Sequence, residues 1–169
     1  MAHVGHENED VVNEGKSQMS LLNTNSRYLH ENINQLTKEL LSTVPKELSV
    51  VHYVNSGSEA NELAIRMMKA HSGSNNIIVS QHGYHGNTNV CVDISSYKFD
   101  GKGGNGPPEN TYVIPIPNNF NGKHKGNKID DKYVSEIKKQ IKKIKQDRRI
   151  LGGFIIDCLL YTSPSPRDR

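Results

Sequence analysis

The sequence predicts an α/β fold, a mostly parallel sheet with flanking helices. Three short apolar runs, at 76–80, 111–116 and 153–156, have the length and β-branched content of buried strands. Apolar residues at helical spacing precede and separate these runs, most clearly at 129–149. Strands that alternate with helices are typical of a parallel sheet, which gives the fold class.

The first part of the chain predicts helical segments that lead into the sheet. Residues 1–16 have little periodicity and predict a loop that runs into a helix. Residues 29–41 predict an amphipathic helix. Its apolar face would consist of Leu29, Ile33, Leu36, Leu40 and Leu41. Residues 50–54, VVHYV, are β-branched and aromatic and predict a further buried strand.

A small polar turn, NSGS at 55–58, separates this strand from a predicted helix. Glu59 and Glu62 follow at once, and negative side chains are favoured in the first turn of a helix. A strand, a Gly/Ser turn and a helix together present backbone N–H groups and a positive helix end to an anion. We therefore expect a phosphate group to bind at Gly57 and Ser58.

A second loop, at 81–88, follows the predicted strand 76–80. Ligands of open α/β sheets bind at the carboxyl ends of the strands, where this loop lies. Tyr84 stands between Gly83 and Gly86, so its ring could lie flat against a heteroaromatic ligand.

The kind of phosphate ligand follows in part from what the turn at 55–58 lacks. A P-loop requires a Gly-Lys-Ser/Thr ending and a dinucleotide site requires G-x-G-x-x-G, and neither occurs here. A short loop without lysine suits one phosphate monoester, and the aromatic loop then suggests pyridoxal phosphate. Alternatively, Ser58 only caps its helix and Tyr84 packs in a core. The residues alone leave both interpretations open.

Composition argues against several classes of function. The 169 residues are only 34% hydrophobic and 6% aromatic with no Trp, which is little material for a core. The net charge of +3 is too small to indicate a nucleic-acid partner, so the lysine-rich 138–145 is interpreted as a solvated helix face. No apolar run has membrane-spanning length. His3 and His6 lack a third ligand, so no metal site is expected.

Five motifs carry a resemblance to a known family. They are NSGSEAN at 55–61, GYHG at 83–86, AHVGH at 2–6, LLNTNSRYLH at 21–30 and DISSYKFDGKGG at 93–104. The first two resemble the phosphate loop and the ring-stacking loop of the class-III aminotransferases, pyridoxal-phosphate enzymes of fold type I. The other three resemble a subgroup that includes the ethanolamine-phosphate and phosphohydroxylysine phospho-lyases and related aminotransferases. The resemblance covers residues 2–157.

The resemblance implies roles for four residues and a set of partners. Gly57 and Ser58 would bind the phosphate of pyridoxal 5′-phosphate, Tyr84 would stack on its pyridine ring, and His85 would lie behind Tyr84. The substrate would be a small-molecule amine or a phosphorylated amine, with a keto acid as acceptor if the enzyme is a transaminase. A homodimer is expected for the full-length parent, and a soluble cytoplasmic or mitochondrial setting is the default.

The resemblance also implies an internal fragment. The family's Schiff-base lysine and pyridinium-binding aspartate would lie beyond this chain, which would then hold no catalytic residue and be inactive alone. Residues 1–49 would lead into the large cofactor-binding domain, and 50–157 would form part of that domain. Residues 158–168 are similar to a translated sequencing adapter, and 158–169 are expected to be a non-native tail. The alternative to an enzyme is a non-catalytic binding protein that retains part of the fold.

Overall fold

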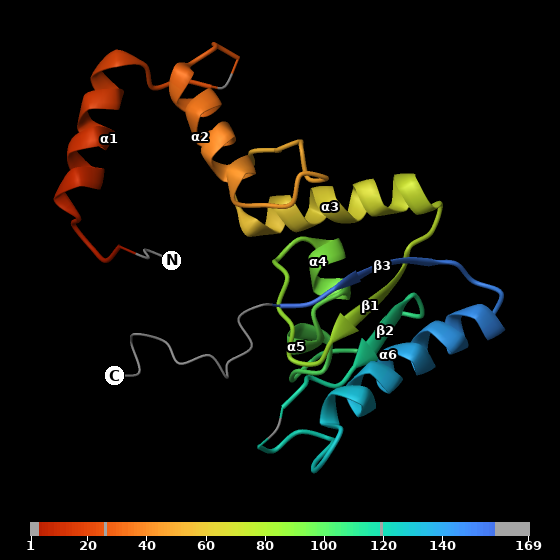
Figure 1. Ribbon diagram of the computed structural model, residues 1–169. Helices are drawn as coiled ribbons and strands as arrows, with labels where there is room; N and C mark the ends of the chain where they lie inside the picture. Colours follow the sequence, from red (N-terminus) through yellow and green to blue (C-terminus); the bar gives the residue numbers. More distant parts are fainter. Residues whose placement is uncertain (1–3, 26, 119, 158–169) are drawn as a thin grey trace. The chain divides into compact units, whose positions relative to one another are not determined.

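A computed structural model describes residues 4–25, 27–118 and 120–157 (Figure 1). The predicted non-native tail, 158–169, lies outside the described residues. The elements in chain order are α1 (Glu9–Leu21), α2 (Glu31–Ser42), α3 (Gly57–Ser72), β1 (Asn76–Ser80), α4 (Asn89–Asp93), α5 (Ser96–Phe99), β2 (Thr111–Ile114), α6 (Ile129–Gln146) and β3 (Leu151–Ile155). The chain divides into two compact units, Met1–Val51 and His52–Arg169.

The first unit contains α1 and α2. The side chain of Asn8 accepts a hydrogen bond from the N–H of Val11 and so caps α1, and the His30 ring caps α2 in the same way through Asn32. The predicted helix at 29–41 is confirmed, with a start two residues later. No residue of either helix is buried, so the apolar face of α2 is not part of a core in the described residues.

The second unit is built on a three-stranded parallel sheet with the order β2-β1-β3. The predicted strand at 76–80 is confirmed. β2 ends at Ile114, two residues earlier than predicted, because Pro115 has no N–H to continue the ladder. β3 begins earlier than predicted because Leu151 already pairs with Asn76.

The predicted strand at 50–54 is wrong. These residues form no strand, and no strand of the described chain pairs with them. Val50 is 73% exposed and Tyr53 is 50% exposed. A strand is stabilised by the neighbour that shares its hydrogen bonds, and β-branched composition alone cannot supply that neighbour.

Helices cover both faces of the sheet, as Figure 1 shows. Ile77 and Val79 of β1 point to one face, where they pack with Ile65 of α3 and with residues of α4 and α5. Ile78 points to the other face and packs against Ile144 of α6. Alternate residues of a strand face opposite sides, so one central strand serves both cores. This arrangement confirms the predicted α/β class.

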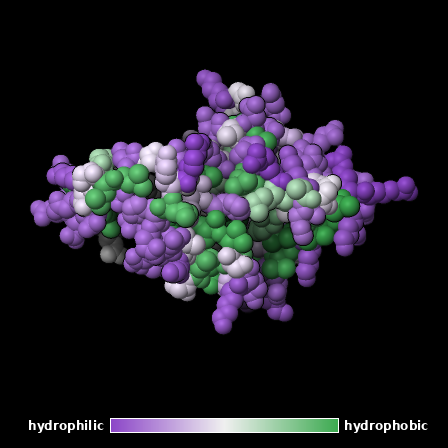
Figure 2. Space-filling view, turned by 90° about the horizontal axis from the view of Figure 1, so that it is seen from above, coloured by the Kyte–Doolittle hydropathy of each residue, from purple (hydrophilic) through white to green (hydrophobic). Residues whose placement is uncertain are grey.

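Part of the apolar surface remains uncovered in the described chain. Figure 2 shows hydrophobic side chains reaching the surface among hydrophilic ones. In the second unit these include Phe154 of β3, which is 48% exposed and pairs with Ile78 in the sheet. β3 is an edge strand, so this side chain lies at the border of the core on the α6 face.

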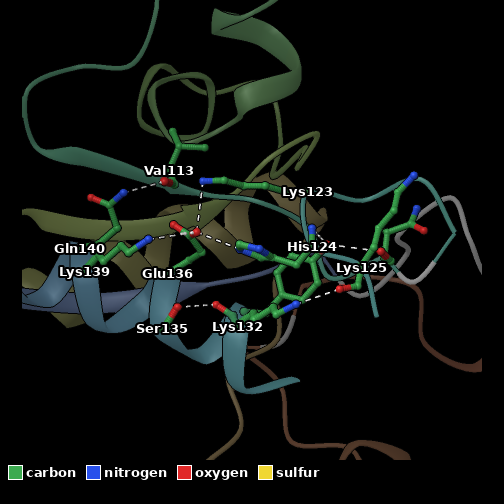
Figure 3. A network of polar contacts seen from close by, with 11 residues as sticks. Val113, Lys123, His124, Lys125, Lys132, Ser135, Glu136, Lys139 and Gln140 are labelled. Atoms are coloured by element: carbon green, nitrogen blue, oxygen red, sulfur yellow. Dashed lines mark hydrogen bonds and ion pairs between the residues drawn. The ribbon is translucent and has the colours of Figure 1, made fainter. Parts of the chain in front are cut away.

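A buried carboxylate fastens the loop at 115–128 to α6 (Figure 3). Oε1 of Glu136 lies 2.9 Å from Nε2 of His124 and 3.1 Å from Nζ of Lys123. Nζ of Lys139 lies 3.4 Å from the same oxygen. Burial would raise the pKa of the Glu136 carboxyl, but the hydrogen bonds from these side chains outweigh it and hold the pKa below its ordinary value.

Candidate functional site

The start of α3 presents free backbone N–H groups. Ser56, not Ser58, is the capping residue: its hydroxyl accepts a hydrogen bond from the N–H of Glu59 at 3.2 Å. The Glu59 carboxylate accepts in turn from the N–H of Asn55 at 2.6 Å. No hydrogen bond among the described residues uses the N–H of Gly57 or Ser58. Both groups are therefore available to an anion at the positive end of the helix.

Side chains of α3 hold the aromatic loop, residues 81–88. Nδ2 of Asn61 donates to the carbonyl oxygen of His85 at 2.6 Å. The hydroxyl of Ser58 accepts from the N–H of Asn87 at 3.1 Å. Since Ser56 caps the helix, the hydroxyl of Ser58 is free to join the turn at 55–58 to the aromatic loop. The interpretation of Ser58 as a mere helix cap is wrong.

Gly86 allows the loop to approach α3 this closely. A Cβ atom at this position would lie 2.6 Å from Oγ and 2.8 Å from Cα of Ser58. Its φ of +132° is also one that residues with a side chain rarely adopt. Only glycine meets both requirements without displacing Ser58.

Tyr84 is not part of a core. Its side chain is 46% exposed and makes an edge-to-face contact with Tyr97, with ring centroids 6.1 Å apart. Nζ of Lys98 lies 5.6 Å from the centroid of the Tyr84 ring. The N–H of Tyr84 donates to Oδ2 of Asp157 at 3.3 Å. The interpretation of Tyr84 as a core residue is therefore wrong, and its ring remains accessible to a ligand.

His85 is buried, with 5% of its surface exposed, and its Nε2 has no hydrogen-bond partner among the described residues. Burial lowers the pKa of the imidazole, and the nearby Asp157 carboxylate opposes that effect only in part. The ring is therefore neutral at pH 7. Oγ of Ser80 is likewise buried without a partner in the described part of the chain, and the two atoms lie 3.3 Å and 3.0 Å from the position that a Cβ atom on Gly83 would occupy.

Gly57, Ser58, Tyr84 and His85 line one pocket of about 280 Å³. The structure thus brings together all four residues predicted to bind the cofactor. The pocket lies where α3 begins and β1 ends, the edge of a parallel sheet at which ligands bind.

Two further lining residues, Asn61 and Gly86, had no predicted role. Both belong to the quoted motifs NSGSEAN and GYHG. Their roles depend on contacts between segments more than twenty positions apart.

The described chain contains neither a metal cluster nor a membrane-spanning helix. No group of three His, Cys, Asp or Glu side chains in it could hold a metal ion. No helix in that part of the molecule combines the length and the apolar character needed to cross a bilayer. His3, considered in the sequence as a metal ligand, is outside the described residues.

The sequence profile of the class-III aminotransferases matches residues 1–157. The chain belongs to the class-III aminotransferase family. The members of this family are pyridoxal-phosphate-dependent enzymes, so the match confirms the predicted family and its cofactor. The match includes the loops that form the pocket.

Similar curated proteins include both aminotransferases and a phospho-lyase. An alanine–glyoxylate aminotransferase 2-like protein of Drosophila melanogaster is 41% identical over 123 residues, 73% of this chain and 25% of the relative. Ethanolamine-phosphate phospho-lyase homolog 1 of Caenorhabditis elegans is 36% identical over 123 residues, 73% of this chain and 26% of the relative. The chain thus spans about a quarter of the length of these relatives.

Solved structures agree with this assignment. A phospholyase from Arthrobacter in complex with phosphoethanolamine superposes with a TM-score of 0.76 at 27% identity, covering 92% of this chain and 36% of the other. Taurine:2-oxoglutarate aminotransferase from Bifidobacterium kashiwanohense, in complex with PLP and glutamate, superposes with a TM-score of 0.70 at 18% identity. This match covers 90% of this chain and 35% of the other. The second similarity shows the fold alone.

Proposed function

We propose that this chain supplies the phosphate-binding and ring-stacking part of a cofactor site. The enzyme would transfer an amino group or eliminate phosphate from a phosphorylated amine. The observation that supports this most directly is the pocket in which Gly57, Ser58, Tyr84 and His85 meet. The cofactor would be pyridoxal 5′-phosphate.

The start of α3 fits one phosphate monoester. The N–H groups of Gly57 and Ser58 have no other partner in the described chain, and the helix dipole favours a negative charge beside them. The absence of a side chain at Gly86 lets the aromatic loop lie directly against Ser58 at the start of this helix. A polyphosphate would need a compensating cation, and no lysine or arginine lines this pocket in the described residues.

The aromatic loop fits a heteroaromatic ring. The exposed Tyr84 ring offers a flat apolar surface that orients a bound ring and shields one of its faces from water. His85 contributes a neutral imidazole ring to the lining of the same pocket. When bound, pyridoxal phosphate supplies an electron sink for a substrate amine.

The partners of the whole protein are also part of this proposal. The substrate would be a small amine or a phosphorylated amine, and a keto acid would accept the amino group in the transaminase case. The names of the relatives include both reactions, which supports either outcome. Residues 50–157 would contribute to the cofactor-binding domain and 1–49 would lead into it. A homodimer would cover part of the exposed apolar surface.

The test uses the protein expressed from the complete reading frame that contains this sequence. We expect a visible absorption band of bound cofactor that borohydride reduction removes. We then expect either phosphate release from phosphoethanolamine or amino transfer from an amine to 2-oxoglutarate. A protein that binds no pyridoxal phosphate and catalyses neither reaction would contradict the proposal and favour the non-catalytic alternative.

A further inference from the structure

Two adjacent buried serines hold the backbone on either side of Tyr84. The hydroxyl of Ser95 accepts a hydrogen bond from the N–H of His85 at 2.8 Å. The hydroxyl of Ser96 accepts from the N–H of Gly83 at 3.0 Å, and the same N–H also donates to the carbonyl oxygen of Ser80 at 3.4 Å. Both serines are 0% exposed. The two peptide N–H groups that flank Tyr84 are thus bound by consecutive residues of one turn.

Each serine is itself anchored in the fold. Oγ of Ser95 donates to the carbonyl oxygen of Cys91 in α4 at 2.5 Å. Oγ of Ser96 donates to the carbonyl oxygen of Ser80, the last residue of β1, at 2.9 Å. Each hydroxyl therefore accepts from the loop and donates to an element of the core. The aromatic loop is fastened at one point to a helix and at the other to the central strand.

The carbonyl groups on either side of Tyr84 are bound as well. The N–H of Tyr97 donates to the carbonyl oxygen of Gly83 at 3.1 Å, and Asn61 donates to that of His85 at 2.6 Å. Fixing the neighbouring residues restricts the two soft backbone dihedrals of Tyr84 and the direction of its Cα–Cβ bond. Only side-chain rotation then remains to place the ring.

We propose that Ser95 and Ser96 are positioning residues that hold Tyr84 ready to stack on the cofactor before it binds. This inference rests on the proposed function of the pocket. Neither serine lines the pocket, and we assign their effect to the position of Tyr84 between the two N–H groups that they bind. A ring already in place loses less conformational freedom when a ligand binds, and this strengthens binding.

The structure offers a closely matched control for Ser95→Ala. The buried Ser74 hydroxyl also accepts from a backbone N–H, that of Asn76 at 3.1 Å, and in addition from Nδ2 of Asn76 at 2.9 Å. It also donates to a carbonyl, that of Ile150 at 2.5 Å. Ser74 precedes β1 and lies at the end of the strand opposite the pocket. Both variants thus remove a buried serine hydroxyl that joins a backbone N–H to a carbonyl oxygen. Ser95→Ala removes it near the pocket, and Ser74→Ala removes it away from the pocket.

The probe is pyridoxamine 5′-phosphate, which has no aldehyde and binds without a bond to a lysine. Its dissociation constant and induced circular dichroism are measured on the protein from the complete reading frame, along with the urea midpoint. We expect both alanine variants to lower the midpoint. Only Ser95→Ala should weaken binding, roughly tenfold, and change the circular dichroism. Ser96→Ala should also weaken binding and change the circular dichroism. It replaces Ser95→Ala in the experiment if that variant does not fold.

A double variant separates positioning from general damage. In a Tyr84→Ala background, Ser95→Ala should weaken pyridoxamine phosphate binding no further, because the ring through which it acts is gone. Wild-type affinity in both Ser95→Ala and Ser96→Ala overturns the inference, and so does an equal loss in Ser74→Ala. If the wild-type protein binds no pyridoxamine phosphate, the proposed function itself fails.

Discussion

At the scale of single residues, the pocket depends on the missing side chain of Gly86. We predict that Gly86→Ala lowers the free energy of unfolding by about 1–3 kcal/mol and abolishes binding of pyridoxamine phosphate. The added Cβ would lie 2.6 Å from Oγ of Ser58 and would displace it. Gly103→Ala is the control, because Gly103 also has a positive φ, +85°, but nothing within 4 Å of its Cβ position. Equal effects of the two substitutions on binding would contradict the role given to the close approach.

The Tyr84 ring is predicted to contribute to ligand binding rather than to stability. Tyr84→Ala should weaken pyridoxamine phosphate roughly tenfold and Tyr84→Phe much less, because stacking needs the ring and not the hydroxyl. The urea midpoint should change little, since 46% of the side chain is exposed. Phe120→Ala, which removes a ring that is 90% exposed and lies outside the pocket lining, is the control for a lost surface aromatic. An equal loss of affinity in both alanine variants would argue against stacking on Tyr84.

The lowered pKa of His85 leads us to predict that the free energy of unfolding depends on pH. Its pKa is lowered from 6.5, because burial disfavours the imidazolium, with the Asp157 charge acting in the opposite direction. Between the folded-state pKa and 6.5 the unfolded chain binds a proton that the folded chain does not. The free energy of unfolding should therefore fall as the pH falls below 6.5.

Urea unfolding at several pH values tests this dependence. His85→Gln should reduce the loss of stability in that range, and His71→Gln, at an exposed position of α3, should not. An unchanged pH profile in His85→Gln would show that another group causes the loss.

At the scale of elements, Glu136 is predicted to fasten the loop at 115–128 to α6. Glu136→Gln should lower the free energy of unfolding by about 1 kcal/mol at pH 7, because it weakens hydrogen bonds from Lys123, His124 and Lys139. Its lowered pKa means that the stabilisation is complete above 4.5 and is lost as the pH falls through the folded-state pKa.

The difference between wild type and Glu136→Gln should therefore shrink in acid. Thermal unfolding across this pH range measures that difference. Asp130→Asn, an exposed carboxylate on the same helix, is the control. A difference that stays constant down to low pH would exclude an ionic contribution of Glu136.

Elements with strong periodicity or composition could be predicted from the sequence. The apolar patterns of β1, α3 and α6 predict these elements. The strand β2 was also predicted, and only its end differs, because Pro115 stops the strand two residues early. α4 and α5 were not predicted, because helices of five and four residues carry too few positions for a periodic pattern. The strand expected at 50–54 does not form. Its composition suits a strand, but no strand of the described chain pairs with it.

The candidate site could be predicted in part. Gly57, Ser58, Tyr84 and His85 stand in two local motifs and were found there. The packing of Gly86 on Ser58 joins residues 28 positions apart, as the bond between Asn87 and Ser58 joins residues 29 apart. Such contacts follow from the fold and leave no local pattern in the sequence.

At the scale of the whole molecule, the parallel sheet explains why these segments meet. Its three strands run in the same direction, so their carboxyl ends share one edge. There β1 ends at Ser80 before the aromatic loop, and Asp157, which follows β3, accepts the hydrogen bond of the Tyr84 N–H. The free N–H groups of α3 lie beside the same loop. The fold thus joins a helix end suited to a phosphate and an exposed ring.

The most direct measurement compares the affinities of pyridoxamine 5′-phosphate and pyridoxamine for the protein from the complete reading frame. The two ligands share the ring and differ only in the phosphate that we assign to Gly57 and Ser58. We predict saturable binding of the phosphorylated ligand and at least about a hundredfold weaker binding of pyridoxamine, since several charge-assisted hydrogen bonds are lost. Equal affinities, or no binding of either ligand, would contradict the assignment of this pocket as the cofactor phosphate site.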